Sequence, residues 1–241
     1  MTGAQAPTLD VERELMRGGF RFIAGMDEVG RGALAGPVSV GVVMIDATCA
    51  SVLPGVRDSK LLSAAQREAL ISDIEKWCVS SAVGHAGPAD IDRMGITRAL
   101  GLAGRRALAE LDAVPDVVLL DGNADWLSGR GVQLGLAEAA ESAGAADGDD
   151  GRLPPVRTRV KADLTSVTVG AASVLAKVCR DALMAGLAPE FPHFDWQLNK
   201  GYGTAAHRAM ISRHGPCRHH RTSWRLPSSA GRDALPTAGE A

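Results

Sequence analysis

The N-terminal part of the chain contains two runs of apolar and β-branched residues separated by a glycine-rich stretch. The runs are FRFIAGM, residues 20–26, and PVSVGVVMI, residues 37–45, and the stretch between them reads DEVGRGALAG. Short apolar runs bounded by glycine and charged residues are typical of β-strands. The pattern therefore predicts two neighbouring strands joined by a glycine-rich loop that starts where the first strand ends.

An amphipathic helix is predicted over residues 63–77. Ser63 followed by Gln66 has the spacing of a capping box, and the next apolar residues recur at helical intervals. These apolar positions are Leu70, Ile71, Ile74 and Trp77. A strand over residues 78–84 follows it.

The middle of the chain combines a long helical pattern with a short buried strand. Residues 89–111 have helical spacing, but Gly95, Gly101 and Gly104 weaken it, so we expect two helices or one bent helix. The strand DVVLL, residues 116–120, ends in the turn sequence Asp-Gly-Asn.

The second half of the chain predicts one more strand and two helices. VRTRVKA, residues 156–162, alternates like a strand, and Thr204 caps a helix over 205–213. A longer helix over 167–185 has a buried face made of Ala171, Val174, Leu175, Val178 and Ala182. Strands alternating with helices predict an α/β fold with a mixed β-sheet flanked by helices and a helical C-terminal portion.

The composition divides the chain into one domain with flexible additions. We expect an N-terminal extension, residues 1–19, a single domain over 20–226, and a disordered tail over 227–241. Residues 128–155 are rich in Gly, Ala and Asp, so we expect a mobile surface insertion with a short helix at 134–142.

Composition also excludes several protein classes. The 241 residues contain no apolar run near the length of a membrane helix, roughly 18 residues, and no secretory signal, so a cytoplasmic protein is expected. The four cysteines are widely spaced and form no CxxC pair, so we expect reduced, mostly buried thiols rather than disulfides or a four-cysteine zinc site. They are Cys49, Cys78, Cys179 and Cys217.

The net charge of −2 conceals an uneven distribution. Residues 157–225 contain eleven Lys and Arg against four Asp and Glu, so this segment carries +7 and the rest of the chain −9. A basic segment on an otherwise acidic protein suggests a polyanionic partner such as nucleic acid.

Four acidic residues stand where predicted strands end: Asp27, Glu28, Asp121 and Asp163. Ligands of α/β sheets bind at strand ends, so these carboxylates converge if their strands are neighbours. Convergent carboxylates without Cys or His suit a hard cation, Mn²⁺ or Mg²⁺. The alternative is that each one caps a helix or forms a turn.

Three loops could bind phosphate. Gly30 and Gly32 allow close approach of the backbone, and Arg31 between them offers a phosphate-binding fork, although a tight hairpin explains the same glycines. Lys60 and Tyr202, the only tyrosine, lie in loops just before helices, where backbone N–H groups bind phosphate or are simply capped. We expect Tyr202 to be exposed. No dinucleotide fingerprint or phosphate-binding P-loop occurs, so NAD and ATP sites are not supported.

Two further groups of residues have simpler explanations. Lys177, Arg180 and Asp181 lie on the polar side of the 167–185 helix and favour a solvated face with an i,i+4 ion pair. The HxxCxHH segment, with His214, Cys217, His219 and His220, could be imagined as a zinc cluster. It lacks a second ligand pair, so a basic segment facing nucleic acid is the better interpretation.

The motifs together resemble a known family. GMDEVGRGALAGPV, DSKLLS, LLDGN, VKAD, SVTVGAASVLAKVCRD, NKGYGT and HGPCRHHRTSW occur in the order and spacing of bacterial type 2 ribonuclease H, ribonuclease HII. The resemblance extends over residues 20–225. It implies the ribonuclease H fold and endonucleolytic cleavage of the RNA strand of RNA/DNA hybrids, and of duplex DNA on the 5′ side of embedded ribonucleotides.

The resemblance also assigns roles to individual residues. It implies that Asp27, Glu28, Asp121 and Asp163 hold two Mn²⁺ or Mg²⁺ ions, and that the products carry 5′-phosphate and 3′-hydroxyl ends. It further implies that Gly30, Arg31 and Gly32 read the 2′-hydroxyl through backbone groups. Tyr202 then senses the RNA–DNA junction, and Lys60 contacts a phosphate.

Two departures and two alternatives accompany this resemblance. The stretch between DGN and KAD is unusually long, and Trp224 stands where the family usually has Phe. The alternatives are a non-catalytic nucleic-acid-binding protein and a DNA nuclease of the same superfamily. We expect a monomer whose partner is nucleic acid and which does not bind a membrane.

Overall fold

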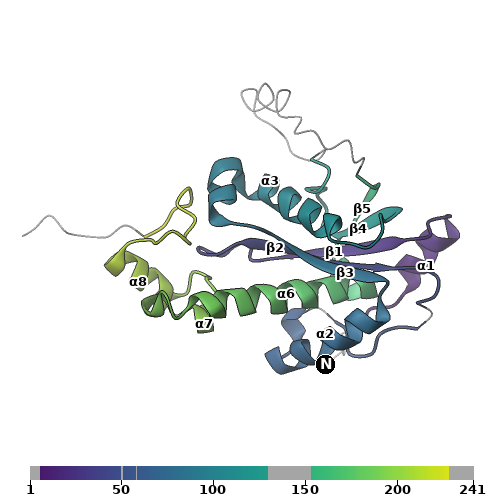
Figure 1. Ribbon diagram of the computed structural model, residues 1–241, viewed down its shortest axis with the longest axis horizontal. Coiled ribbons are helices and arrows are strands. Elements are labelled where there is room, and N and C mark those ends of the chain that lie inside the picture. The colour runs from purple at the N-terminus through teal and green to yellow at the C-terminus, as the bar shows by residue number, and fades with distance from the viewer. Residues whose placement is uncertain (1–5, 50, 58, 130–152, 228–241) are drawn as a thin grey trace, which may run out of the picture.

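The computed structural model describes residues 6–49, 51–57, 59–129 and 153–227 (Figure 1). The predicted helix at 134–142, most of the predicted insertion and nearly all of the predicted tail lie outside these residues. The described elements are α1 (Asp10–Arg17), β1 (Ile23–Val29), β2 (Val38–Ile45), η1 (Ser59–Leu61), α2 (Ala64–Trp77), β3 (Ser80–Ala86), α3 (Pro88–Ala109), β4 (Val117–Asp121), β5 (Val156–Arg159), α5 (Ala162–Thr165), α6 (Val167–Leu187), η2 (Pro192–Phe194), α7 (Trp196–Asn199) and α8 (Ala205–His214).

The strands form one five-stranded sheet in the order β3-β2-β1-β4-β5. The glycine-rich loop turns the chain back, so β1 pairs antiparallel with β2, and β2 with β3. The pairs β1–β4 and β4–β5 are parallel. The predicted mixed sheet is therefore confirmed, with β1 at its centre.

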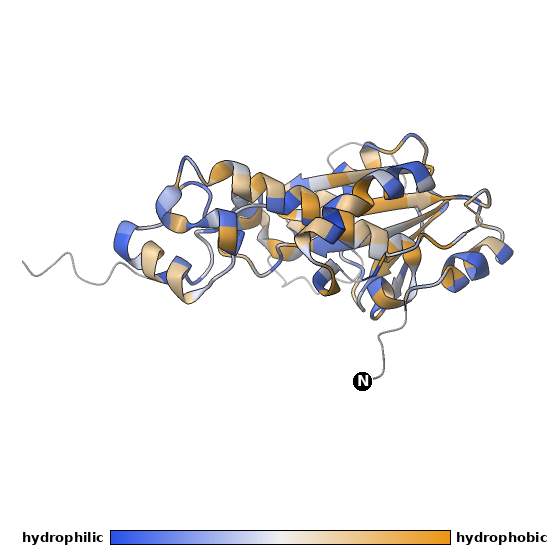
Figure 2. Cartoon of the chain, turned by 90° about the horizontal axis from the view of Figure 1, so that it is seen from below, coloured by the Kyte–Doolittle hydropathy of each residue, from blue (hydrophilic) through white to orange (hydrophobic). Residues whose placement is uncertain are grey.

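Helices cover both faces of the sheet. In Figure 1, α3 lies on one side of the strands, and α6 and α2 lie on the other. Residues of β2 alternate between the two layers: Val42 joins the core beneath α3, while Val43 joins the core formed with α2 and α6. Because both faces are covered, all eight residues of β2 are buried. Figure 2 shows the same division, with hydrophobic residues along the strands and hydrophilic ones on outer helix turns.

The predicted helix signals determine where two helices begin and where a third one bends. The Ser63 hydroxyl accepts a hydrogen bond from the Gln66 N–H, and Gln66 Oε1 accepts one from the Ser63 N–H, which is the capping box expected for α2. Thr204 caps α8 in the predicted way. The long helix α3 is broken at Gly95, which adopts φ 78°, so the expected bend is confirmed. Gly104 does not bend it; a Cβ there would lie 2.7 Å from Leu127.

The N-terminal residues contribute a helix that the hydrophobic pattern did not predict. Helix α1 carries Glu12, which is fully buried and accepts hydrogen bonds from the Ser166 hydroxyl at 2.6 Å and from Thr168 N–H at 3.0 Å. These contacts fasten α1 to the start of α6. Apolar residues of α1 add to this attachment, since Val11 belongs to a buried cluster and Leu15 and Met16 pack against another.

Three details of the sequence interpretation were wrong. The strand expected over 156–162 ends at Arg159, because Lys161 adopts a left-handed conformation and starts the short helix α5. The buried face of α6 is not a stripe: every residue from 167 to 176 is buried, while Ala182 is exposed. The four cysteines are free but half-buried rather than mostly buried. Among the described residues, no helix is long and apolar enough to cross a membrane.

Candidate active site

Three of the four candidate carboxylates lie at one end of the two central parallel strands. Met26 of β1 is in register with Leu120 of β4, so the next residues, Asp27 and Asp121, stand side by side. Glu28 follows Asp27. Both lie within β1, and not after it as the sequence suggested, because the strand continues to Val29. Their position at the strand ends nevertheless brings the carboxylates together.

Asp163 reaches this region by a different route. It does not follow a strand directly, as expected, but lies buried in α5 after the left-handed residue Lys161. The neighbouring Ala162 N–H donates to Asp121 Oδ1 at 2.7 Å. That hydrogen bond connects the helix bearing Asp163 to the end of β4, which carries Asp121.

Burial and mutual repulsion shape the electrostatics of this cluster. Burial raises the pKa of Asp27 to about 7; a hydrogen bond from Ser173 opposes the shift, and the charges of Glu28 and Asp121 add to it. Burial also raises the pKa of Glu28, with Arg31 acting in the opposite direction. A carboxylate is costly to keep ionised in such surroundings unless a cation compensates it.

The donor set fits a divalent cation. All four side chains offer oxygen ligands, which hard ions such as Mg²⁺ and Mn²⁺ prefer. Among the described residues, no group of three or more His, Cys, Asp or Glu side chains is arranged so that it could hold a metal ion. An ion held by fewer carboxylates would need further oxygen ligands from water or substrate.

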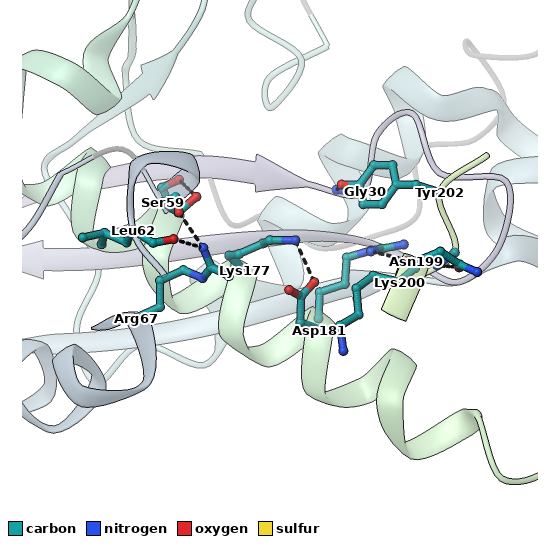
Figure 3. Close-up of polar contacts among 12 residues, drawn as sticks. Gly30, Ser59, Leu62, Arg67, Lys177, Asp181, Asn199, Lys200 and Tyr202 are labelled. Carbon is teal, nitrogen blue, oxygen red and sulfur yellow. Dashed lines mark hydrogen bonds and ion pairs between the residues drawn. The ribbon is translucent and has the colours of Figure 1, made fainter. Parts of the chain in front are cut away.

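A hydrogen-bonded chain connects Asp27 with the loop that carries Lys60. The Ser173 side chain bonds to Asp27, and its oxygen lies 2.9 Å from the hydroxyl oxygen of Ser59. Arg67 donates to the carbonyls of Ser59 and Leu62 at 2.7 and 2.6 Å, as Figure 3 shows. The exposed Lys60 between them is therefore held at a fixed place beside the carboxylate end of the sheet.

Two loops lie in contact next to the carboxylates. They are the glycine loop, residues 30–37 between β1 and β2, and the tyrosine loop, residues 200–204 between α7 and α8. The Gly30 N–H donates to the Tyr202 hydroxyl at 3.2 Å (Figure 3). Ala33 forms an isolated β-bridge with Tyr202. Tyr202 is half-buried, so its expected exposure was wrong: Lys177 and Arg180 lie over its ring. Arg31 is exposed and forms an ion pair with Glu28 at 3.4 Å.

The polar side of α6 is only partly solvated. Lys177 and Asp181 form the expected i,i+4 ion pair at 2.9 Å. Arg180 was expected on the same solvated face, which was wrong, because its side chain is fully buried. It runs between the sheet and the C-terminal loops, where it donates to backbone carbonyls.

The HxxCxHH segment is linked to the tyrosine loop through His207. His220 is buried, with its Nε2 3.2 Å from His207 Nε2, and its Nδ1 accepts from the Cys217 N–H at 3.0 Å. His207 Nδ1 lies 2.9 Å from the Tyr202 carbonyl oxygen. Burial lowers the pKa of His220 to about 4, so this imidazole is neutral near pH 7. Its contacts are those of a packed core beneath Tyr202.

Three residues near the site escaped the sequence interpretation as functional candidates: Ser173, Arg180 and Arg221. Each belongs to a motif that was noticed, SVTVGAASVLAKVCRD or HGPCRHHRTSW. Nothing in the local pattern distinguishes a buried arginine from a solvated one. Only their contacts reveal them.

Comparisons with known proteins agree with this geometry. The sequence profile described as Ribonuclease HII matches residues 24–226. Ribonuclease HII of Streptomyces avermitilis is 41% identical over 239 residues, 96% of this chain and 87% of the relative. Ribonuclease HII of Paracoccus denitrificans is 39% identical and covers 90% of this chain and 91% of its own length.

Solved structures give the same picture. The ribonuclease H2 of Pyrococcus horikoshii superimposes with a TM-score of 0.63 at 26% identity, covering 85% of this chain and 94% of its own. The ribonuclease HII of Archaeoglobus fulgidus, solved in a complex with PCNA, gives a TM-score of 0.62 at 27% identity, with 88% and 98% covered.

Proposed function

Because this chain belongs to the ribonuclease HII family, whose members are metal-dependent endonucleases acting on RNA/DNA hybrids, we propose that it also cuts duplex DNA 5′ of a single embedded ribonucleotide. We assign metal binding and catalysis to Asp27, Glu28, Asp121 and Asp163. Substrate binding falls to the Gly30–Arg31–Gly32 backbone, Lys60 and Tyr202. The products would carry 5′-phosphate and 3′-hydroxyl ends.

One contact carries this proposal: the hydrogen bond between Gly30 N–H and the Tyr202 hydroxyl. It joins the glycine loop and the tyrosine loop into one surface directly after the strand that bears Asp27 and Glu28. Because the hydroxyl accepts from Gly30, its own proton remains for another acceptor. A ribose 2′-hydroxyl is such an acceptor, and it is the group that distinguishes RNA from DNA.

The carboxylates supply the cation site that such cleavage needs. Two divalent ions, when bound, lower the pKa of an attacking water and neutralise the charge on the leaving 3′-oxygen. The chain itself orients two of these carboxylates: Ser173 forms a hydrogen bond with Asp27, and the Ala162 N–H donates one to Asp121. We propose Mn²⁺ or Mg²⁺, since both are oxygen-seeking ions.

Charge on the surrounding loops favours a nucleic-acid duplex without reading its sequence. Arg31 and Lys60 are exposed and can contact phosphate groups. Arg31 lies beside Glu28, and Ser59, next to Lys60, is linked to Asp27 through Ser173. Such contacts fix the register of a duplex but carry no base information. We propose that the protein acts on its substrate as a monomer in the cytoplasm.

The test is a cleavage assay with end-labelled duplexes. One duplex contains a single ribonucleotide, one is an RNA/DNA hybrid and one is all DNA, each incubated with Mg²⁺, Mn²⁺ or chelator. We expect metal-dependent cleavage of the first two and none of the third, with the first cut on the 5′ side of the ribonucleotide. Cleavage of all-DNA duplex would indicate a DNA nuclease, and binding without any cleavage would indicate a nucleic-acid-binding protein.

A further inference from the structure

Two fully buried arginines lie beneath the glycine loop. Arg180 comes from the middle of α6, and Arg221 follows α8 near the end of the described chain; neither has an exposed side chain. Neither takes part in an ion pair with a described carboxylate. Burying a guanidinium without a carboxylate is costly unless its donors are satisfied in another way.

Backbone carbonyls of the loop between β1 and β2 provide that satisfaction. Arg221 donates to the carbonyls of Gly30 at 2.7 Å, Arg31 at 2.9 Å and Gly36 at 3.1 Å. Arg180 donates to Ala35 at 3.1 Å and Pro37 at 2.8 Å. Five loop carbonyls are thus bound by two side chains that are remote in sequence.

The direction of these carbonyls decides where the N–H groups of the loop point. In a trans peptide the C=O and the following N–H point in opposite directions, and no cis peptide occurs among the described residues. The Gly30 and Arg31 carbonyls face Arg221, so the N–H groups of Arg31 and Gly32 face away from it. Among the described residues, these two N–H groups have no backbone acceptor.

Arg180 also connects this loop with the tyrosine loop. Its third donor binds the Lys200 carbonyl at 3.0 Å, and its guanidinium lies 5.3 Å from the centre of the Tyr202 ring. A Cβ on Gly30 would lie 2.1 Å from Arg180 Nε, so glycine is needed where the side chain passes. The two loops are held together from below by one guanidinium.

Trp224 completes the arrangement. Its ring lies 4.8 Å from the Arg221 guanidinium carbon, within the range of a cation–π contact, for which tryptophan is the best partner. Burial lowers the pKa of Arg221 to about 9, which still leaves the guanidinium charged at neutral pH.

We propose that Arg180 and Arg221 are positioning residues that turn the N–H groups of Arg31 and Gly32 and the Tyr202 hydroxyl toward the ribose, and so determine ribonucleotide specificity. The inference rests on the proposed function of this site. Neither arginine touches substrate; each acts through the carbonyls it binds. Lysine keeps the charge but cannot span three carbonyls, because only the guanidinium has a planar fork of donors.

The first experiment measures specificity in R221K and R180K. We expect kcat/KM at a single embedded ribonucleotide to fall about 10-fold or more, equivalent to about 1.4 kcal/mol, with a smaller loss on long hybrids. The matched control is R106K. Arg106 also donates to a backbone carbonyl, that of His85 at 2.7 Å, but its side chain lies on the exposed side of α3. Parallel losses in all three variants, or unchanged discrimination in both R221K and R180K, would overturn the proposal.

The second experiment uses the single tyrosine of the chain as a probe. Protein labelled with 3-fluorotyrosine gives one ¹⁹F signal, which reports on the Tyr202 ring without any substrate. We expect this signal to shift or broaden in R180K and R221K and to stay unchanged in R106K. An unmoved signal in both site variants contradicts the proposal even if activity falls.

The third measurement needs no variant and so does not depend on mutant folding. In wild-type protein, the Arg31 and Gly32 amide protons should exchange rapidly with solvent, because they form no hydrogen bond to the backbone. They should also give high ¹H–¹⁵N NOE values, because the backbone there is rigid. Low NOE values would mean a floppy loop and refute the positioning role. Failure of the proposed function looks different: wild-type protein would not prefer ribonucleotide-containing duplex, while the ¹⁹F and NOE results would still stand.

Discussion

The carboxylate cluster and the glycine loop lie next to each other at the end of β1. Both regions contain buried charged side chains, but the protein compensates these charges in one region and not in the other. Asp27 is buried with Glu28 and Asp121 close by and has no cationic side chain bonded to it. Arg180 and Arg221 are buried too, but their donors are matched by backbone carbonyls. The buried carboxylates therefore gain stability when a cation binds, whereas the buried arginines are already stabilised by the protein.

This difference indicates what each region does. A cluster of carboxylates that repel one another is ready to gain stability from a cation. A loop whose carbonyls are already bound stays rigid and presents only its N–H groups. Changes in the first region should therefore act on chemistry and on metal-dependent stability, and changes in the second on recognition.

The largest expected effect comes from the carboxylate cluster. Asp121→Asn should lower cleavage by about 10³-fold, since loss of a charged metal ligand removes several kcal/mol of charge stabilisation. The amide still accepts a hydrogen bond from the Ala162 N–H, so the fold and duplex binding should be retained. Single-turnover cleavage and fluorescence anisotropy, measured side by side, check this. Activity equal to wild type would remove Asp121 from the ligand set.

A smaller effect is expected in the recognition region. Tyr202→Phe removes the hydroxyl that accepts from Gly30 N–H, so cleavage at a single ribonucleotide should fall about 10-fold, the effect of losing about one hydrogen bond. Affinity for all-DNA duplex should not change. A uniform loss of affinity for every duplex would mean that Tyr202 only supports the fold.

The pH dependence of stability offers a third comparison. The pKa of Asp27 is raised to about 7 in the folded protein from about 3.9 unfolded, so stability from this group is full below pH 4 and is lost as pH rises through 7. In chelator at pH 8, Asp27→Asn should therefore melt several degrees above wild type, since 1 kcal/mol corresponds to about 2–4 °C for a chain of this size.

Differential scanning fluorimetry at pH 5 and pH 8 tests this sign. The advantage of the variant should be clearly smaller at pH 5 than at pH 8, and Mn²⁺ should raise the melting temperature of wild type only. Asp46→Asn is a suitable control, because hydrogen bonds from Thr48 lower the pKa of this exposed carboxyl and it lies at the far end of β2. An Asp27→Asn protein that melts below wild type at pH 8 would contradict the assignment of buried repulsion.

The smallest effect concerns phosphate contacts. Lys60→Ala should weaken binding of all duplexes by a similar factor and reduce the slope of log affinity against log salt by about 1, because one released counterion is lost. Lys76→Ala, at the other end of α2, provides the control. A change in discrimination between RNA and DNA in the Lys60 variant would instead assign Lys60 to ribose recognition.

Much of this site could be read from the sequence because its signals are local. Helix caps at Ser63 and Thr204 act within one turn, and strand patterns repeat every second residue. The four carboxylates were identified because each stands near the end of a strand or just after one, and parallel strands bring such ends together. The exact strand limits at Asp27 and at Arg159 were misplaced, since pairing partners and a left-handed residue decide them.

The tertiary structure alone decided which polar residues are buried and what they bind. Arg180 lies on the polar side of α6 by spacing, yet the loops that fold over that side bury it. The bond between Gly30 and Tyr202 joins residues 172 positions apart. Local periodicity shows which face of an element is apolar, but contacts between remote loops depend on how the whole chain packs. Sequence therefore determined the elements and the candidate acidic residues, and packing determined the contacts through which the buried arginines hold the glycine loop.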